Sequence, residues 1–347
     1  MIVKINPQKP EKKLIQKAAQ IIKRGGLVAF PTETVYGLGA NALDKKAVRK
    51  IFTVKQRPLD NPLIVHIANK KDLVGLVKEI PKEVEVLAKK FWPGPLTIIF
   101  LKKEIVPDEV TAGGKTVALR IPKNKIALEL IKAAGVPVAA PSANLAGKPS
   151  STTAQDVFED FGDRVDLILD GGKTKIGIES TVVDVTVNPP VLLRPGGVSF
   201  SELKKILKNL KLHPLILGKK TPEEVVKSPG MKYRHYSPKA QLILVKGKSK
   251  ERISKIQKLI NYYQKQKKKV GVMTVLENKD FYPQADLVLS VGSQKDLEKI
   301  GQNLFKALRE FDRRKIEVIL TEGLKEKGMG FAIMNRLEKA ASKILGT

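Results

Sequence analysis

The chain has 347 residues, 42% of them hydrophobic, which is enough for two domains that each bury a core. It has no cysteine and only three histidines, so disulfides, thiolate catalysis and cysteine-ligated zinc are excluded and a multi-histidine metal site is disfavoured. The net charge of +29 favours polyanionic partners such as nucleotides or nucleic acid, although lysines spread over the whole length also fit a thermophile-like surface.

The sequence predicts a cytoplasmic protein. The first residues, MIVKINPQKP, lack the apolar stretch and the small-residue cleavage site of a signal peptide. No apolar run approaches the ~18 residues that a membrane-spanning helix needs.

Up to about residue 210, short apolar runs alternate with helical patterns, which predicts an α/β domain over 1–210. Helices are expected at 11–24, 45–53, 82–91, 125–134, 154–161 and 201–208. Strands are expected at 27–30, 63–67, 96–101, 116–121, 138–140, 167–169, 180–185 and 191–193. The close spacing of the strands from Thr181 onward indicates some antiparallel pairing.

Residues 211–239 form a proline-rich linker in which long regular elements are not expected. This linker carries Tyr233, His235 and Tyr236, which are two of the six tyrosines and one of the three histidines of the chain. Solvated linkers are rarely aromatic. We therefore expect the linker to lie against another part of the protein.

Residues 240–347 predict a smaller second α/β domain of ordinary size. Its strands are expected at 242–245, 270–275, 287–291 and 316–320. Its helices are expected at 252–266, 296–311 and 332–345.

The segment PTETVYGLGANA (31–42) follows the first buried strand with three hydroxyls and the carboxylate of Glu33. Glycine costs backbone entropy inside regular elements. Gly37 and Gly39 therefore suggest a sharp turn or a close approach of a ligand, with an ordinary strand-to-helix turn as the alternative.

Lys55 and Arg57 precede Pro58, and proline disfavours helix at the residue before it. In an extended chain, residues two apart point to the same side. The two side chains then form a paired cation suited to a polyphosphate. Taken singly, either residue is also an ordinary surface cation of this basic chain.

Ser142 and Asn144 repeat the spacing of two after the predicted strand 138–140, at a strand end where α/β sheets bind ligands. The run Ser150 to Thr153 follows, and Thr153 is a good N-cap for the next helix. The start of that helix is a possible anion site, with simple capping as the alternative.

Arg120 lies four residues after Thr116 on an apolar strand, so both side chains face one side. A buried arginine needs a partner, either a substrate carboxylate or a structural acid. His66, in LIVHI, is more commonly a satisfied core histidine in such a setting. Ser180 stands at a strand start and Arg194 at a strand end.

Seven segments occur in the order found in the YrdC-like family, which the chain resembles, and specifically in its two-domain threonylcarbamoyl-AMP synthases. They are PTETVYGLGANA, KQRPLDNPLIVHI, FWPGPLT, TVALRIP, PSANLAGKPSSTTAQDV, ESTVVDV and LLRPGGVS. The linker segment SPGMKYRHYSP and the C-terminal GMGFAIMNRLEKAA match as well.

The resemblance implies an open twisted mixed α/β sheet with a basic concave face, plus a smaller Rossmann-like C-terminal domain. It implies that L-threonine, bicarbonate and ATP, with Mg²⁺, give threonylcarbamoyl-AMP and pyrophosphate. A partner transferase would then pass the threonylcarbamoyl group to a tRNA adenosine.

The resemblance also implies residue roles. The catalytic tetrad would be Lys55, Arg57, Ser142 and Asn144. L-Threonine would contact Thr32, His66, Arg120 and Ser180. The nucleotide would contact Lys55, Arg57, Asn61, Thr116, Ser142, Asn144, Ser150 and Arg194, with Tyr233 covering the site.

Two other functions remain open at this point. A non-catalytic RNA-binding protein using the basic face would show salt-sensitive RNA affinity and no ATP turnover. A related carbamoyl-transfer enzyme would act on carbamoyl phosphate. The pairs Lys55–Arg57 and Ser142–Asn144 do not separate it from a synthase, whereas Arg120 and Ser180 favour the synthase.

Overall fold

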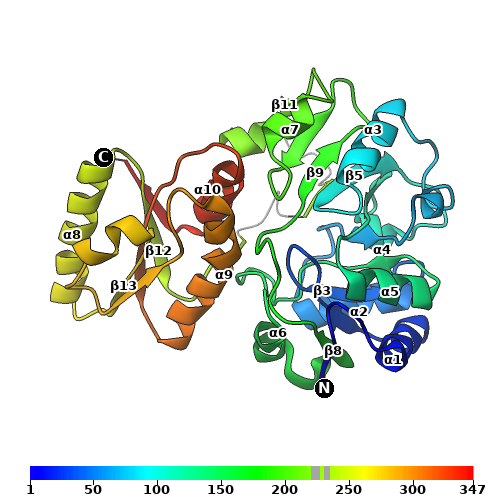
Figure 1. Cartoon of the computed structure of the whole chain (residues 1–347), viewed down its shortest axis with the longest axis horizontal. Coiled ribbons are helices and arrows are strands. Elements are labelled where there is room, and N and C mark those ends of the chain that lie inside the picture. The colour runs from blue at the N-terminus through cyan, green and yellow to red at the C-terminus, as the bar shows by residue number, and fades with distance from the viewer. Residues whose placement is uncertain (220–226, 230–234, 347) are drawn as a thin grey trace. The chain divides into compact units, whose positions relative to one another are not determined.

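The computed structural model describes residues 1–219, 227–229 and 235–346. The chain forms two compact units, each with its own sheet (Figure 1). Undescribed residues apart, unit 1 comprises Met1–Ala146, Ser150–Lys175 and Glu179–Tyr233, and unit 2 comprises Gly147–Pro149, Ile176–Ile178 and Arg234–Thr347.

Unit 1 is built on an 11-stranded mixed sheet in the order β1-β8-β2-β3-β7-β4-β6-β5-β9-β10-β11. Its strands are β1 (Ile2–Lys4), β2 (Val28–Phe30), β3 (Gly37–Asn41), β4 (Ile64–His66), β5 (Leu96–Leu101), β6 (Thr116–Arg120), β7 (Val138–Ala139), β8 (Leu167–Asp170), β9 (Thr181–Asp184), β10 (Val191–Arg194) and β11 (Lys211–Leu212). Its α-helices are α1 (Lys12–Lys23), α2 (Lys45–Lys55), α3 (Lys82–Phe91), α4 (Asp108–Thr111), α5 (Lys125–Ala134), α6 (Ala154–Phe161) and α7 (Phe200–Lys204). Three 3₁₀ turns complete it: η1 (Lys70–Leu73), η2 (Gly162–Arg164) and η3 (Pro214–Leu217).

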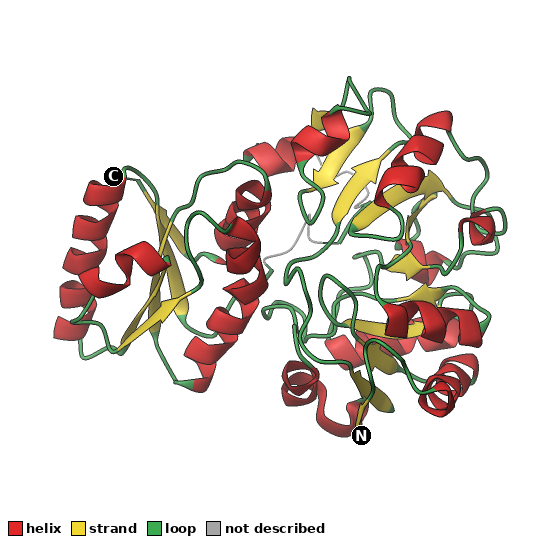
Figure 2. Ribbon diagram, in the orientation of Figure 1, coloured by secondary structure: helices red, strands yellow, loops and turns green. Residues whose placement is uncertain are grey.

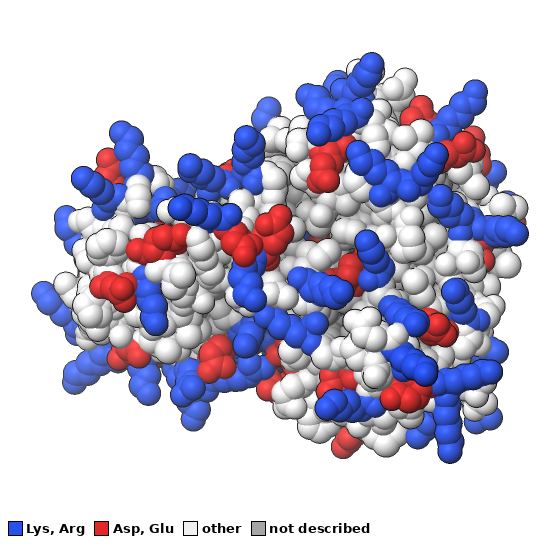
Figure 3. Space-filling model, in the orientation of Figure 1, with Lys and Arg blue, Asp and Glu red and all other residues white. Residues whose placement is uncertain are grey.

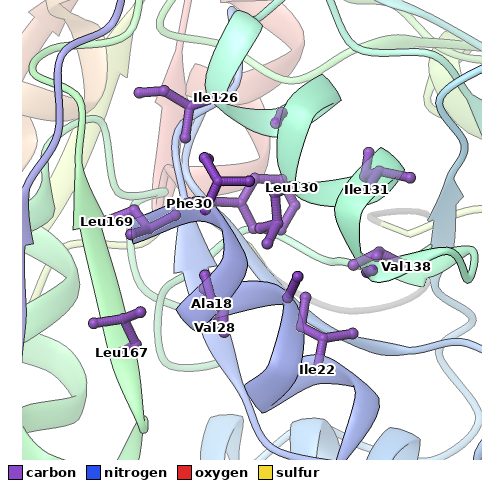
Figure 4. Packing of buried hydrophobic residues seen from close by; sticks show 14 of the residues in the cluster. Ala18, Ile22, Val28, Phe30, Ile126, Leu130, Ile131, Val138, Leu167 and Leu169 are labelled. Carbon is purple, nitrogen blue, oxygen red and sulfur yellow. The ribbon is translucent and has the colours of Figure 1, made fainter. Parts of the chain in front are cut away.

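Helices α1 and α5 pack against β2 and β8 around a hydrophobic core of unit 1 (Figure 4). Helix α5 is fixed at both ends, because the Asn124 side chain accepts the backbone N–H of Ala127 and Gly135 closes the helix at φ 62°. Its apolar face packs against α1, β2, β7 and β8. The residues of this core include Ala18, Ile22, Val28, Phe30, Ile126, Leu130, Ile131, Val138, Leu167 and Leu169.

The two glycines of the segment 31–42 lie in β3, an antiparallel strand that the sequence did not predict. A Cβ added at Gly39 would lie 2.7 Å from Cε1 of Phe30 and 2.8 Å from Cγ1 of Val138. Gly39 therefore leaves room for the Phe30 ring. The sharp turn expected at Gly37 and Gly39 is wrong, because both residues lie in β3. The expected close approach of a ligand stays a prediction.

Unit 2 is built on a five-stranded parallel sheet in the order β14-β13-β15-β12-β16. Helix α8 covers one face, and α9 and α10 cover the other (Figure 2). The elements are β12 (Gln241–Val245), α8 (Ser249–Lys265), β13 (Val270–Thr274), η4 (Leu276–Phe281), β14 (Leu287–Ser290), α9 (Leu297–Arg313), β15 (Val318–Glu322), α10 (Met329–Ala340) and β16 (Lys343–Leu345).

The layers of unit 2 match the Rossmann-like expectation, but the strand order differs in one respect. In dinucleotide-binding folds the first two strands are neighbours, whereas here β15 separates β12 from β13. The predicted last helix, 332–345, is also wrong at its end. Helix α10 stops at Ala340, and β16 pairs with β12 instead.

One face of α9 holds several segments of unit 2. Gly301, Phe305 and Arg309 are four residues apart, so they lie on one side of the helix. Phe305 stacks on Tyr236 with ring centroids 5.3 Å apart. Nη2 of Arg309, which is buried, donates to the carbonyl of Pro149 at 2.6 Å. The linker residue Tyr236 thus lies against another part of the protein, as expected.

Gly177 packs against the same side of α9. Its φ is +80°, and an added Cβ would lie 2.4 Å from Cα of Gln302 and 2.6 Å from the carbonyl oxygen of Gly301. Only glycine meets both conditions. The chain then continues through Ile178 into Glu179 and Ser180.

No helix among the described residues is both long enough and apolar enough to span a bilayer.

Candidate active site

The register of β4 and β6 places several candidate residues on one face of the unit 1 sheet. The strands are parallel, with Ile64 beside Ala118 and His66 beside Arg120. Because side chains alternate along a strand, Thr116 shares the face of Ala118 and Arg120. Ile64 and Ala118 belong to a small buried cluster completed by Ile99, Val182 and Leu193. This face thus has an apolar floor, with polar side chains at the ends of β6.

On β4 and β6 themselves, the threonine and nucleotide candidates lie at opposite ends. His66 and Arg120 end β4 and β6, whereas Thr116 begins β6 and Asn61 precedes β4. Four residues of extended chain separate Thr116 from Arg120 by about 13 Å. A ligand contacting both residues must therefore be long, as a nucleotide joined to an amino acid is.

Arg120 forms a buried ion pair with Glu33. The distance between Nη2 of Arg120 and Oε1 of Glu33 is 2.7 Å, and the side chains are 4% and 5% exposed. Nε of Arg120 donates to the carbonyl of Gly94 at 3.2 Å. Of the two partners open from the sequence, the structure thus supplies the structural acid. Among the described residues, however, neither Glu33 oxygen nor Nη2 of Arg120 makes an aligned hydrogen bond.

His66 is buried beside Arg120, and its Nδ1 has no hydrogen-bond partner among the described residues. Burial, and then the positive charge of Arg120, lower the pKa of His66 to about 3. The ring is therefore neutral near pH 7. It packs edge-on to Phe30, with centroids 6.4 Å apart and an angle of 90°. A fully satisfied core histidine would also have a partner at Nδ1, so the core interpretation is incomplete.

Thr32 shapes the turn that carries Glu33. Its hydroxyl donates to the carbonyl of Val35 at 2.7 Å and accepts the backbone N–H of Thr34 at 3.1 Å. Such a local side-chain turn fixes the backbone where no regular element does. In this structure the Thr32 hydroxyl therefore positions its neighbour Glu33.

Ser180 and Arg194 are brought together at the start of β9 and the end of β10. Arg194 donates through Nη2 to Oγ of Ser180 at 3.1 Å and through Nε to its carbonyl at 3.0 Å. The Thr97 hydroxyl lies 2.7 Å from the same Oγ. Thr97 was not among the residues expected from the sequence, although its hydroxyl in the apolar run LTIIFL could have indicated it.

Lys55 and Arg57 do not lie on an extended segment, so that expectation is wrong. Lys55 ends α2, and Gln56 takes the left-handed conformation at φ 52°. Nζ of Lys55 donates to the carbonyl of Ser142 at 2.6 Å and also to that of Asn144. The structure thus joins three members of the predicted tetrad.

Arg57 turns toward Asn61 instead. Its Nη2 donates to Oδ1 of Asn61 at 2.5 Å and its Nε donates to the Asn61 carbonyl at 3.1 Å. Arg57 and Asn61, which are both nucleotide candidates, are therefore held together by these hydrogen bonds in the segment before β4.

Ser150 is fully buried and donates to Oε1 of Glu179 at 2.5 Å. Thr153 caps α6 in a capping box with Asp156, as expected for an N-cap. The side chain of Asp156 also accepts the backbone N–H of Thr152. The start of α6 is thus bonded by its own residues, which confirms the capping interpretation of this run.

The described part of the linker contacts β9 and β10 within unit 1. Nζ of Lys227 lies 2.8 Å from Oδ2 of the buried Asp184. Nη1 of Arg194 donates to the carbonyl of Pro229 at 3.4 Å. Tyr233, which was expected to cover the site, lies outside the described residues.

Comparisons with known proteins identify the family. Residues 20–196 match the family model described as "Telomere recombination", and residues 198–342 match that of the threonylcarbamoyl-AMP synthase C-terminal domain. The threonylcarbamoyl-AMP synthase of Pyrococcus abyssi is 53% identical over 94% of this chain and 94% of its own length. The chain belongs to the threonylcarbamoyl-AMP synthase family. The synthase of Bacillus subtilis is 47% identical over 94% of this chain and 92% of its own length.

Solved structures confirm the fold expected for this family. The crystal structure of P. abyssi Sua5 complexed with L-threonine has a TM-score of 0.95 and 50% identity, covering 100% of this chain and 99% of that one. Escherichia coli YciO, at a TM-score of 0.52 and 28% identity, covers 57% of this chain and 96% of its own. The mixed α/β sheet with a second, smaller sheet domain is therefore a family feature.

Proposed function

We propose that this protein is an L-threonylcarbamoyladenylate synthase, a nucleotidyltransferase. It converts L-threonine, bicarbonate and ATP into threonylcarbamoyl-AMP, pyrophosphate and water. The observation that carries the proposal is the buried set of Glu33, Arg120 and His66, in a chain whose full-length relatives are synthases of this kind. Buried polar groups without partners are rare, and a polar ligand explains them.

In this proposal L-threonine lies at the Arg120 end of β6. Arg120 and Ser180 hold its carboxylate, and Thr32 and His66 contact its remaining polar groups. A neutral His66 suits this role, because it can donate or accept a hydrogen bond without adding charge. The fixed contact between Arg194 and Ser180 supports the serine in its position.

The nucleotide extends from Arg194, which bonds Ser180 at the threonine end, toward Thr116 and Asn61 at the other end of β6 and β4. Lys55, Arg57 and Arg194 face its phosphates, and neutral hydrogen bonds come from Asn61, Thr116, Ser142, Asn144 and Ser150. Lys55 and its two carbonyl partners support this placement, since they hold the 142–144 loop against the end of α2.

The reaction needs no protein nucleophile. The threonine amine takes up the one-carbon unit to form a carbamate, one oxygen of which attacks the α-phosphorus while pyrophosphate leaves. Catalysis rests on positioning and on cations that meet the charge of the transferring group. Because the product hydrolyses easily, covering the site by the linker excludes water. The contacts of Lys227 and Pro229 support such a cover.

Magnesium belongs to the proposal only as a companion of ATP. Among the described residues, no group of three or more His, Cys, Asp or Glu side chains is arranged to hold a metal ion. The described residues thus offer Mg²⁺ no cage of three or more such side chains. The ion would be held by phosphate oxygens and water, as Mg²⁺ often is.

The product serves the N6-threonylcarbamoylation of a tRNA adenosine by a partner transferase, which is the wider role that we propose. The non-catalytic RNA-binding alternative is disfavoured, because the relatives that this chain matches over more than nine-tenths of their length are named as synthases. A direct contact between this chain and tRNA would give an RNA affinity that falls as the salt concentration rises.

One assay tests the proposal. The protein is incubated with ATP, bicarbonate and isotopically labelled L-threonine, and the products are analysed by mass spectrometry and phosphate assays. We expect the threonylcarbamoyl adenylate together with pyrophosphate. Release of orthophosphate without the adenylate would refute the adenylation chemistry. Salt-sensitive RNA binding without turnover would favour the alternative.

A further inference from the structure

Glu33 has no role in the assignments above, yet it is a buried acid of the site. Its side chain is 5% exposed, and its only ion pair among the described residues is with Arg120. Both carboxylate oxygens lack an aligned hydrogen bond there. Removing a carboxylate from water is costly unless hydrogen bonds replace the lost ones. A further donor at Glu33 would therefore be strongly favoured.

The charges of the three groups Arg120, Glu33 and His66 indicate what kind of ligand would supply the missing donor. Arg120 contributes one positive charge, Glu33 one negative charge and His66 none. A ligand of zero net charge that carries a positive group at one end and a negative group at the other can pair with these residues without burying an unpaired charge. An α-amino acid zwitterion has this form, because its ammonium carries three N–H donors and its carboxylate accepts from a guanidinium.

We propose that Glu33 binds the α-amino group of the substrate while Arg120 holds the α-carboxylate. This inference rests on the proposed function and adds a residue that determines specificity to it. Glu33 then selects an amino acid over the corresponding hydroxy acid and orients the nitrogen that becomes the carbamate. The turn formed by the Thr32 hydroxyl fixes Glu33 for that contact.

The test compares two ligands on two proteins. The ligands are L-threonine and 3-hydroxybutyrate, which keeps the carboxylate and the hydroxyl but lacks the α-amino group. Dissociation constants are measured by NMR titration, which reaches millimolar values. For Glu33→Gln we expect threonine affinity to fall roughly ten- to 100-fold, the range for a lost hydrogen bond to a charged group. The affinity for 3-hydroxybutyrate should change less than about twofold, since the lost contact involves the amine alone.

Three control measurements keep the outcomes separate. Glu109→Gln neutralises another carboxylate of unit 1, which forms an ion pair with Arg49. This variant should leave the affinities for both ligands unchanged. Arg120→Gln should weaken both ligands. Glu33→Asp, which retains the charge, should recover part of the threonine affinity and replaces Glu33→Gln if that variant does not fold.

An equal loss for both ligands in Glu33→Gln would make Glu33 a support for Arg120 and overturn the inference. An unchanged threonine affinity would also overturn it. If the unaltered protein itself binds no threonine, the proposed function fails, which is a different result.

Discussion

At the scale of single residues, His66 links the site to the stability of the fold. The ordinary pKa of histidine is about 6.5, whereas that of His66 in the folded protein is about 3. The unfolded chain therefore binds a proton at His66 that the folded protein does not, and stability falls as the pH decreases from 6.5 toward 3. At pH 5 this one group lowers the free energy of unfolding by ~2 kcal/mol relative to pH 7.5.

Urea denaturation at pH 7.5 and pH 5 measures this effect. In His66→Gln, which cannot titrate, the difference between the two pH values should shrink by that amount. A variant with the same pH dependence as the unaltered protein would show that His66 titrates normally in the folded state.

Residues of the site show what the sequence could and could not predict. The sequence showed that Arg120 needs a partner, but not that Glu33 is that partner, because the two are far apart in the chain and meet only through the fold. The pairing of Lys55 with Arg57 failed for a local reason. A left-handed Gln56 ends α2 there, and no simple pattern marks a glutamine for that conformation.

At the scale of secondary-structure elements, the sequence predicted best where apolar periodicity is strong and caps are clear. Helices α3, α5 and α6 and strand β5 have the predicted bounds. Strand β3 was missed because its glycines usually indicate a turn, and their reason, the Phe30 ring, is a tertiary contact. The C-terminal helix was extended too far because the three residues of β16 are too short to show alternation.

The contact of Gly177 with α9 gives a prediction at the same scale. Gly177→Ala would force an alanine into the left-handed conformation and place its Cβ 2.4 Å from the backbone of α9. Together these two effects should lower the free energy of unfolding by about 3 kcal/mol. Urea denaturation measures the loss. Gly135→Ala is the matched control, because Gly135 has φ +62° but nothing within 4 Å of an added Cβ. It should lose only about 1 kcal/mol. Equal losses in the two variants would mean that the contact with α9 contributes nothing.

At the scale of the whole molecule, the charge of +29 is distributed rather than concentrated. Figure 3 shows Lys and Arg over the visible surface of both units, with Asp and Glu among them. The cations assigned to the substrates are instead buried or partly buried in unit 1. The net charge thus favours the approach of anionic ligands, whereas binding depends on a few buried groups.

The two sheets suggest that the second unit folds independently. All strands of the five-stranded sheet come from residues 241–345, and its core is formed by Ile243, Val245, Ile256, Ile260, Val270, Val272, Tyr282, Val318 and Leu320. Only two short loops of unit 2, at 147–149 and 176–178, come from elsewhere in the chain. A fragment of residues 235–347, about 110 residues long, is large enough to bury a core of its own.

We therefore expect the fragment 235–347 to unfold cooperatively in urea, followed by circular dichroism, and to be inactive as a synthase because Lys55 and Arg120 are absent. Its stability should be lower than that of unit 2 in the full chain, since Arg309 loses its hydrogen bond to the Pro149 carbonyl and a lost hydrogen bond of a buried guanidinium is costly. Leu320→Ala, which removes a side chain from the core, should lower the midpoint by an amount equivalent to about 3 kcal/mol. A gradual transition that Leu320→Ala does not shift would mean that this core forms only when the rest of the chain is present.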